Sequence, residues 1–472
     1  MSAVRREHDL LGERDVPAER YYGIHTLRAL ENYNITGIQI SHYPLFIQFL
    51  VLIKKAAAFA NRDLGLLEPQ LADAIAHACD EIYNGALMEE FVVDVIQGGA
   101  GTSTNMNANE VIANRALELL GYEKGRYDIL HPLIHVNLSQ STNDVYPTAL
   151  RMTLSKKMDR LREELEGVRD ALFEKGKEFS HIIKMGRTQL QDAVPMTLGQ
   201  EFEAWAVTVN EDVQRITESQ SLLREINLGA TAIGTGLNAH PDYARIVTNY
   251  LREMSSVPVV LSENLVEATQ DTGVYVQLSG VLKRVAVKLS KICNDLRLLS
   301  SGPRAGLHEI NLPPMAAGSS IMPGKINPII PEVVNQVAFC VIGNDTTVTM
   351  AAEAGQLELN VMEPIIAYSL FTSSEILSRA CRTLTERCIR GITANADVCR
   401  KMVENSIGLA TALNPYIGYE KATEVAHIAL TTNRSVYDVV LEKGYLSKEE
   451  LDAILSPEQM IKPHVFYKPK RI

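Results

Sequence analysis

Residues 275–299 read YVQLSGVLKRVAVKLSKICNDLRLL, and this stretch decides the fold. Its apolar residues recur at alternating spacings of three and four, the pattern of a single apolar seam along a packed α-helix. At about 1.5 Å per residue, such a helix is about 38 Å long. The seam consists of Tyr275, Leu278, Leu282, Val285, Leu289, Ile292, Leu296 and Leu299.

A second seam of the same kind lies upstream, with Lys, Arg and Glu between its apolar positions. Helical periodicity also covers residues 200–224, 331–353 and 360–388, and no run of alternating apolar residues predicts a substantial sheet. We therefore expect a mainly α protein with an elongated central helical bundle. The second seam consists of Leu150, Leu154, Met158, Leu161, Leu165, Val168 and Leu172.

Polar loops separate the predicted helices and suggest three domains. The loops at 97–109, 139–147, 186–195 and 313–328 are rich in Gly, Ser, Thr, Asn and Pro. Near the C-terminus, Ser447 and Glu450 have the spacing of a capping box at the start of a helix. We predict an N-terminal helical domain at 1–140, the long-helix bundle domain at 141–394, and a small C-terminal helical domain at 395–472.

Composition excludes several classes of protein. Because 46% of the 472 residues are hydrophobic, we expect a large core. The formal net charge of −11 would repel polyanions, so we expect no nucleic-acid partner. The six cysteines show no CxxC pair or zinc-finger spacing, which predicts buried, reduced thiols. The basic residues Lys468, Lys470 and Arg471 are interpreted as a solvated terminus without a function.

The N-terminal region carries neither a signal peptide nor a membrane anchor in our interpretation. Residues 1–17 are charged and lack an apolar core segment. The apolar run at 45–53 ends in Lys54 and Lys55, and is too short to span a bilayer. We therefore expect a cytoplasmic protein without a membrane partner.

Three familiar motifs are rejected. The segment ending in Gly324 and Lys325 has the wrong glycine spacing for a phosphate-binding loop, and no Ser or Thr follows the lysine. The glycine clusters at 98–101 and 229–236 lack dinucleotide-binding spacing and a preceding strand. His131 and His135 stand four apart as in zinc proteases, but Pro132 replaces the glutamate, so no metal site is predicted.

Taken alone, four loops rich in hydroxyls and amides, with one lysine, predict a site for a small, polar, anionic substrate. The segment GSSIMPGKINP at 318–328 goes further, because it resembles the signature loop of the fumarase/aspartase superfamily. Similar segments extend along nearly the whole chain, and they match the aspartases best within that superfamily. They are YYGIHTLRA at 21–29, GGAGTSTNMNANE at 98–110, SQSTNDVYPT at 139–148, GRTQLQDAVPMTLGQE at 186–201 and AAEAGQLELNVMEP at 351–364.

The resemblance implies an activity and an assembly. The expected reaction is reversible elimination of ammonia from L-aspartate to give fumarate, without an organic cofactor or a bound metal. The expected assembly is a homotetramer built around a twenty-helix bundle, in which loops of three subunits form each active site.

The reaction explains the residue types. Removal of the C3 proton of aspartate produces a dianionic aci-carboxylate, so hydrogen-bond donors must converge on the β-carboxylate while a base takes the proton. By resemblance, the base is Ser319, and backbone N–H groups with nearby Lys325 would stabilise its oxyanion. The same resemblance assigns the β-carboxylate to Thr102, Ser141, Thr142 and Ser320, the α-carboxylate to Lys325, Asn327 and Thr188, and the amino group to Asn143 and Gln189.

Each of these residues has an ordinary alternative when taken alone. Gly-Ser-Ser sequences usually form local turns, isolated lysines are usually solvated, and Thr102 or Ser141 would usually cap a helix. Glu332, which follows Pro331, is expected in the first turn of a helix, where a carboxylate favours the helix dipole, and is given a supporting role.

Other activities were weighed against ammonia elimination. Class II fumarases share the signature loop but carry histidine at the position of Gln189, and glutamine cannot accept a proton from water. Fumarate hydration is therefore the alternative reaction. A pyridoxal-dependent lyase would need Lys325 as a Schiff base and a phosphate cradle, which a helical bundle does not predict. A structural role, as in lens proteins of this superfamily, fits poorly with intact Ser319, Lys325 and Asn327.

Overall fold

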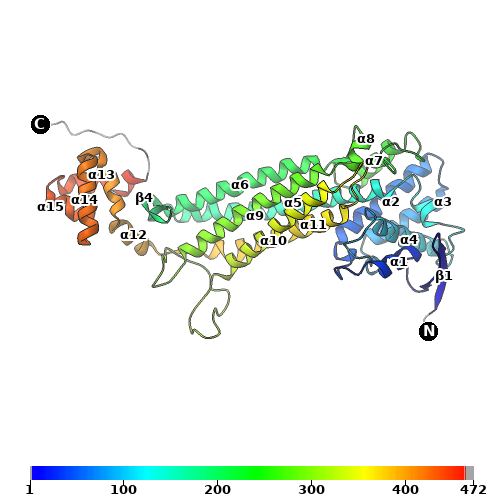
Figure 1. The fold of residues 1–472 in the computed structure, drawn as a ribbon, viewed down its shortest axis with the longest axis horizontal. Coiled ribbons are helices and arrows are strands. Elements are labelled where there is room, and N and C mark those ends of the chain that lie inside the picture. Colours follow the sequence, from blue (N-terminus) through cyan, green and yellow to red (C-terminus); the bar gives the residue numbers. More distant parts are fainter. Residues whose placement is uncertain (1–2, 462, 464–472) are drawn as a thin grey trace. The chain divides into compact units, whose positions relative to one another are not determined.

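The computed structural model describes residues 3–461 and 463, and it is mainly helical as predicted (Figure 1). Both predicted seams are buried: every seam residue of 150–172 is fully buried, and those of 275–299 are at most 5% exposed. The capping box of Ser447 and Glu450 is present. The long helices are α5 (Thr142–Glu178), α6 (Leu198–Leu222), α9 (Gly273–Leu299), α10 (Ile329–Glu353) and α11 (Glu363–Arg387).

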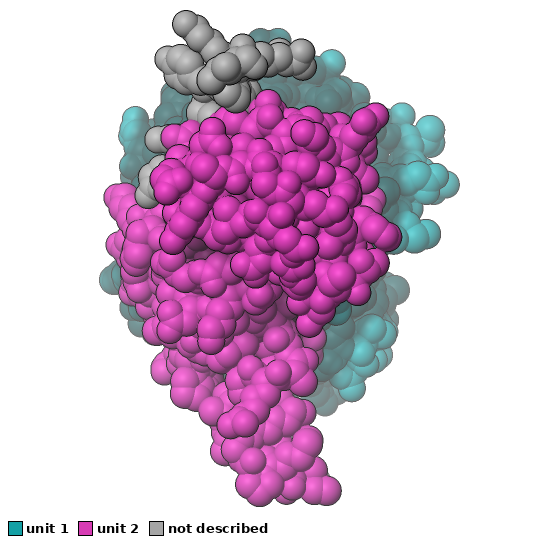
Figure 2. Space-filling view, turned by 90° about the vertical axis from the view of Figure 1, so that its left-hand side faces the viewer, with its two compact units in different colours: residues 1–163, 214–286, 339–378 teal, residues 164–213, 287–338, 379–472 magenta. Residues whose placement is uncertain are grey.

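The chain forms two compact units (Figure 2). Each long helix contributes residues to both units. Unit 1 contains residues 1–163, 214–286 and 339–378, and unit 2 contains 164–213, 287–338 and 379–472. The division into domains at 1–140, 141–394 and 395–472 stays a prediction.

Unit 1 surrounds the apolar helix α2 with shorter helices. Its two-stranded sheets are an antiparallel hairpin, β1 (Val4–Asp9) with β2 (Gly12–Pro17), and a parallel pair, β5 (Glu225–Ile226) with β6 (Val260–Leu261). Its helices besides the long ones are α1 (Ile24–Asn32), α2 (Pro44–Asp63), α3 (Pro69–Tyr83), α4 (Thr102–Leu119), α7 (Tyr243–Met254) and α8 (Leu265–Gln270).

Unit 2 combines the other halves of the long helices with a group of short C-terminal helices. Its antiparallel pairs are β3 (Ile183–Thr188) with β4 (Gln191–Thr197), and β7 (Ile310–Asn311) with β8 (Thr393–Ala394). The short helices are α12 (Ala396–Glu404), α13 (Ala410–Ile417), α14 (Tyr419–Thr432), α15 (Val436–Lys443), α16 (Lys448–Ile454) and α17 (Pro457–Met460).

Helix α2 is the one helix in the described part of the chain that is long and apolar enough to cross a membrane by length and composition. It is a core helix here, with 72% of that apolar window buried. The helix extends beyond the apolar run that ends at Lys54, as far as Asp63, and Lys54 itself is fully buried. The Lys54 ammonium donates to Asn137 Oδ1 and Gln140 Oε1, both at 2.9 Å.

A buried carboxylate organises the start of α1. Glu110, on α4, accepts hydrogen bonds from the backbone N–H groups of Gly23, His25 and Thr26 and from the Thr26 hydroxyl. These are donors that the first turn of a helix leaves without intrahelical partners. Burial raises the pKa of Glu110 to about 7, while the Thr26 and backbone donors oppose that rise.

Several expected loops are shorter than predicted, because helices begin inside them. Helix α4 begins at Thr102 within the loop predicted at 97–109, and α5 begins at Thr142 within that predicted at 139–147. The loop predicted at 186–195 comprises the end of β3, the turn at 189–190 and most of β4. Cys340 is exposed on α10, contrary to the expectation of buried thiols, whereas the other five cysteines are buried and all six are free. Lys468, Lys470 and Arg471 lie outside the described residues.

Helix α5 contains a proline in its second turn, and a polar side chain from outside the helix replaces the backbone hydrogen bond that this proline cannot make. Pro147 has no N–H to donate to the carbonyl of Asn143 one turn earlier. The side chain of Asn227 donates to that carbonyl at 3.0 Å instead. The freed acceptor is therefore satisfied, and the helix tolerates the proline.

In unit 2, α5 and α6 approach each other through two glycines. A Cβ added to Gly199 would lie 2.4 Å from the carbonyl oxygen of Gly176 and 2.6 Å from Cα of Ser180. Both neighbours are backbone atoms, so neither gives way easily. Only glycine fits at position 199 without separating the two helices.

We expect Gly199→Ala to lower the free energy of unfolding by about 1–3 kcal/mol, because the added methyl overpacks a backbone contact. Gly167→Ala is the matched control, since a Cβ at this other glycine of α5 would meet nothing within 4 Å. The control is expected to be neutral or stabilising by up to about 1 kcal/mol, because alanine favours helix. Thermal unfolding of both variants measures the difference, and equal stability would contradict the close approach.

Candidate active site

The segment at 318–328 forms an exposed loop between β7 and α10 in unit 2, and it projects from the bundle (Figure 1). Its two ends are joined, because the Asn327 side chain donates to the carbonyl of Gly318 at 2.7 Å. A Cβ at Gly318 would lie 2.0 Å from the carbonyl oxygen of Lys325, so this closure requires glycine. Ser319 and Ser320 therefore lie at the start of a loop that is closed at its base.

The hydroxyl of Ser319 sits in a small backbone cradle. Its Oγ accepts N–H groups from Ile321 at 3.2 Å and Met322 at 2.9 Å. Two donors aimed at one oxygen stabilise negative charge on it. These are the bonds of a local turn, which the sequence analysis gave as the ordinary alternative for a Gly-Ser-Ser sequence, and the role of Ser319 as a base stays a prediction.

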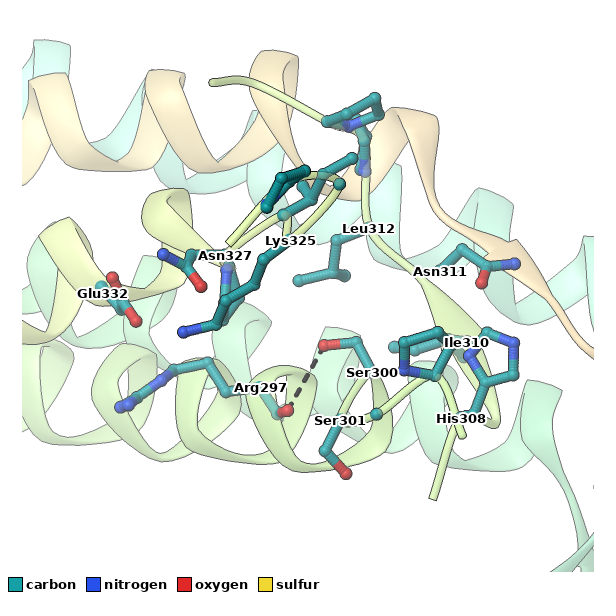
Figure 3. Close-up of a pocket in the computed structure, with 18 residues that line it drawn as sticks. Arg297, Ser300, Ser301, His308, Ile310, Asn311, Leu312, Lys325, Asn327 and Glu332 are labelled. Carbon is teal, nitrogen blue, oxygen red and sulfur yellow. Dashed lines mark hydrogen bonds between the residues drawn. The ribbon is translucent and has the colours of Figure 1, made fainter. Parts of the chain in front are cut away.

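A cavity of about 770 Å³ lies beneath the same loop, entirely within unit 2. Lys325 and Asn327 line it on the same side as Arg297 and Glu332, while His308 and Asn311 lie across from them (Figure 3). Two of the predicted site residues, Lys325 and Asn327, are thus brought together in one cavity.

Sequence reasoning missed five polar residues of this cavity: Arg297, Ser300, Ser301, His308 and Asn311. Arg297 lies in the last turn of α9, and His308 and Asn311 follow in the connection to α10. No motif surrounds them, and their shared position arises only when α9 and α10 pack together. Glu332, predicted in a helix's first turn, lies in the first turn of α10 and lines the cavity.

Thr188 and Gln189 are exposed at the tip of the β3–β4 hairpin. Thr188 pairs with Gln191, so the turn consists of Gln189 and Leu190. Both turn residues have positive φ, 54° and 61°, a conformation typical of Asn-Gly turns and strained for these side chains. The absence of an Asn-Gly signal explains why the sequence predicted a loop here.

The other predicted residues lie in unit 1. Thr102 is exposed at the start of α4, and its hydroxyl donates to the carbonyl of Gly99 at 2.7 Å. The residue before it, Gly101, has φ +89° and stands against the ring of Tyr146, where a Cβ would come within 2.2 Å. Glycine is therefore required just before Thr102.

Ser141, Thr142 and Asn143 form the start of α5. The Ser141 hydroxyl accepts the N–H of Asn143 at 3.2 Å, so its proton is free to be donated elsewhere. Asn143 donates its side-chain N–H to the carbonyl of Ala232 at 2.8 Å, which leaves its oxygen as the free acceptor. Thr142 is buried, 8% exposed.

The side chain of Asp144 fixes the start of α5 by hydrogen bonds. The sequence analysis did not predict this residue. Its buried carboxylate accepts N–H groups from Ser141, Gly229 and Thr231 at 2.9–3.1 Å. Burial raises its pKa to about 7, opposed by these donors. Burial lowers the pKa of Lys54 to about 7, and the charge of Asp144 opposes that shift. Asp144 thus ties the start of α5 to the 229–231 loop, and Lys54 of α2 holds Asn137 and Gln140 just before it.

The ten predicted residues therefore form two groups, one in each unit. Within the described residues, no three His, Cys, Asp or Glu side chains are grouped so that they could hold a metal ion. The group in unit 1 consists of Thr102, Ser141, Thr142 and Asn143, and that in unit 2 consists of Thr188, Gln189, Ser319, Ser320, Lys325 and Asn327.

Known proteins resemble this chain along nearly its whole length. The family model described as Lyase matches residues 12–343, and the model described as Fumarase C C-terminus matches residues 409–462. The aspartate ammonia-lyase of Helicobacter pylori strain J99 is 58% identical over 467 residues, which cover 99% of this chain and 100% of the relative. That of Escherichia coli K12 is 56% identical over 469 residues, covering 99% and 98%.

Solved structures share the fold. A fumarate lyase:delta crystallin from Brucella melitensis, bound to cobalt, is 55% identical with a TM-score of 0.95, covering 98% of this chain and 100% of its own. A class II fumarase from Schistosoma mansoni is 35% identical with a TM-score of 0.94 and the same coverage. With such sequence and structural similarity over nearly its full length, the chain belongs to the lyase family within the fumarase/aspartase superfamily.

Proposed function

We propose that this protein is an aspartate ammonia-lyase, which eliminates ammonia from L-aspartate to give fumarate. The observation that carries the proposal is its 56–58% identity to proteins of that name over nearly the full chain, against 35% to the class II fumarase. Gln189 at the hairpin tip agrees with this choice. Glutamine cannot take a proton from an attacking water, and the departure of ammonia does not need one.

Ser319 is proposed as the base that removes the C3 proton. A serine hydroxyl is a weak base, and it must be present as an alkoxide to accept a proton. The N–H groups of Ile321 and Met322 would stabilise that alkoxide, and the ammonium of Lys325 adds positive charge on the same loop. The electron pair of the broken C–H bond passes into the β-carboxylate and then expels the amino group as ammonia.

The remaining residues would hold the two ends of the substrate. Hydroxyls of Thr102, Ser141, Thr142 and Ser320 are proposed to donate to the β-carboxylate as it gains charge. The free proton of Ser141 is suited to this part, whereas the Thr102 hydroxyl must first turn from Gly99. Lys325, Asn327 and Thr188 would bind the α-carboxylate.

The amino group would be recognised by acceptors. Asn143 offers its side-chain oxygen, because the hydrogen bond from its amide nitrogen to the carbonyl of Ala232 fixes the orientation of the amide. An ammonium group donates three hydrogen bonds, so a free amide oxygen is the matching partner. Gln189 is proposed to supply a second contact to the same group.

We propose that copies of this chain assemble into a tetramer with shared active sites, which would bring the two residue groups together. One face of α10 supports self-association, because its exposed positions carry no charged residue for more than four turns. A helix face exposed to water is normally charged or polar. The positions are Val333, Gln336, Phe339, Cys340, Gly343, Thr346, Thr349 and Met350.

We propose that the enzyme needs no organic cofactor, because the proposed chemistry uses side chains and backbone groups alone. We also propose that it acts in the cytoplasm. A pyridoxal enzyme would absorb visible light through its Schiff base, so an ultraviolet–visible spectrum of the purified protein tests this point. Absorbance bands beyond the protein band would contradict it.

Purified protein should form fumarate from L-aspartate, followed by the ultraviolet absorbance of the product. The same assay with L-malate separates ammonia elimination from fumarate hydration. Fumarate from aspartate and none from malate is the expected result, whereas fumarate from malate alone would establish the fumarase reaction instead.

Ser319→Ala should lower kcat by about 10²–10⁴-fold, because the variant lacks the base while the loop closure through Gly318 and Asn327 remains. Ser180→Ala is the control, since that exposed serine only donates to the carbonyl of Lys177 at a helix end. Size-exclusion chromatography checks that assembly is intact. Activity of Ser319→Ala near that of the control would remove Ser319 as the base.

Phe339→Glu should shift the assembly toward smaller species, because it places a charge in the uncharged face of α10. Phe339 is 64% exposed in the single chain. The control is Leu66→Glu, a leucine 47% exposed in the loop after α2. Light scattering coupled to size-exclusion chromatography measures the masses, and an unchanged mass for Phe339→Glu would rule out this face as an interface.

A further inference from the structure

A buried chain of four alternating charges lies at the base of the β3–β4 hairpin in unit 2. Glu309 is fully buried, with Oε1 at 2.6 Å from an Arg187 nitrogen and Oε2 at 2.9 Å from Lys184 Nζ. Lys184, whose side chain is 3% exposed, also pairs with Glu201 in the first turn of α6. The two positive charges thus balance the two negative ones.

The pairing of β3 with β4 is irregular between the two cations. The register shifts between Met185 and Arg187, because Ala193 and Val194 of β4 stand opposite Gly186 alone, which is a β-bulge in β4. A Cβ on Gly186 would lie 2.8 Å from the carbonyl of Val194, so glycine permits this close pairing.

The backbone of Glu309 is fixed independently of its side chain. Its N–H donates to the carbonyl of Leu299 at the end of α9, and its carbonyl accepts the N–H of Asn395, both at 2.9 Å. Its neighbours His308 and Ile310 line the cavity beneath the signature loop. The carboxylate therefore connects the hairpin to the wall of that cavity.

The hairpin tip needs such support. Gln189 and Leu190 both hold positive φ, which side chains other than glycine and asparagine adopt at a cost. Leu190 is 69% exposed, so no packing of its own side chain within the chain holds the turn. Strained turns persist where the surrounding structure over-determines them.

We infer that Glu309 is a positioning residue, which fixes the hairpin whose tip carries Thr188 and Gln189 by clamping Lys184 and Arg187. The inference rests on the proposed function, because it assumes that Thr188 and Gln189 contact the substrate. Glu309 itself touches no substrate, and it acts through the two cations of β3.

The test uses three variants of the full-length enzyme. Glu309→Gln removes the charge and leaves Arg187 unpaired, so its melting temperature should fall. Glu309→Gln with Arg187→Gln removes one charge of each sign, so the double variant should recover much of that stability. Glu178→Gln is the control, because it removes a carboxylate that is 53% exposed from an ion pair with Lys175 on α5.

For positioning, kcat/KM for L-aspartate should fall by about tenfold to a hundredfold in both Glu309 variants, because small misplacements of substrate contacts have effects of this size. The control should match the wild type. Loss of activity in the double variant despite its recovered melting temperature supports the inference. Recovery of kcat/KM together with stability would overturn it, because Glu309 would then only balance charge.

Amide hydrogen exchange separates this inference from the proposed reaction. Residues 183–197 should exchange faster in both Glu309 variants than in the control, whatever substrate the enzyme uses. Unchanged exchange there would overturn the clamp. Absence of fumarate formation by the wild type, with faster exchange in the variants, would instead defeat the proposed function and leave the clamp standing.

Discussion

The structure depends on the burial of two long apolar seams, which pack the long helices against one another. Within such a helix the backbone groups are paired, and unpaired N–H and C=O groups remain only at its ends. Polar residues are therefore concentrated at helix ends and in the connections between helices. There the backbone N–H groups need acceptors, and three buried carboxylates supply them or fix the segments beside them. Glu110 serves the start of α1, Asp144 the start of α5, and Glu309 the β3–β4 hairpin.

The residues that stabilise these segments are therefore different from the residues proposed to contact the substrate. The carboxylates lie inside the protein, where burial raises the pKa of Asp144 and Glu110 to about 7. Among the side chains proposed to meet the substrate, the Ser141 hydroxyl keeps its proton and the Asn143 amide keeps its oxygen for the ligand. Ser141 combines a structural and a proposed binding role. Its backbone N–H donates to Asp144, and its hydroxyl accepts the N–H of Asn143 and can still donate its own proton.

Patterns of local spacing were sufficient for much of the fold. The seams of α5 and α9, the capping box at Ser447 and the loop at 318–328 all depend on residues close in sequence, and the structure contains each of them. The chain of charges around Glu309 joins residues more than 100 positions apart, so no window of sequence reveals it. Lys54 was taken as the end of an apolar run, because its amide partners near residue 140 are distant in sequence. Residues such as Arg297 and His308 became neighbours of Lys325 only through helix packing.

The position of Lys54 within α2 also affects whether this helix could insert into a membrane during synthesis. Within the described part of the chain, α2 is the helix long and apolar enough to span a membrane, and during synthesis it emerges before Asn137 and Gln140, which receive the ammonium of Lys54 in the folded protein. A charged lysine at the centre of a helix raises the free energy of insertion through the translocon by about 2.5–3.5 kcal/mol. Lys54 and its neighbour Lys55 both stand near the middle of α2. The lysine that the finished core accommodates therefore also discourages the nascent helix from entering a bilayer.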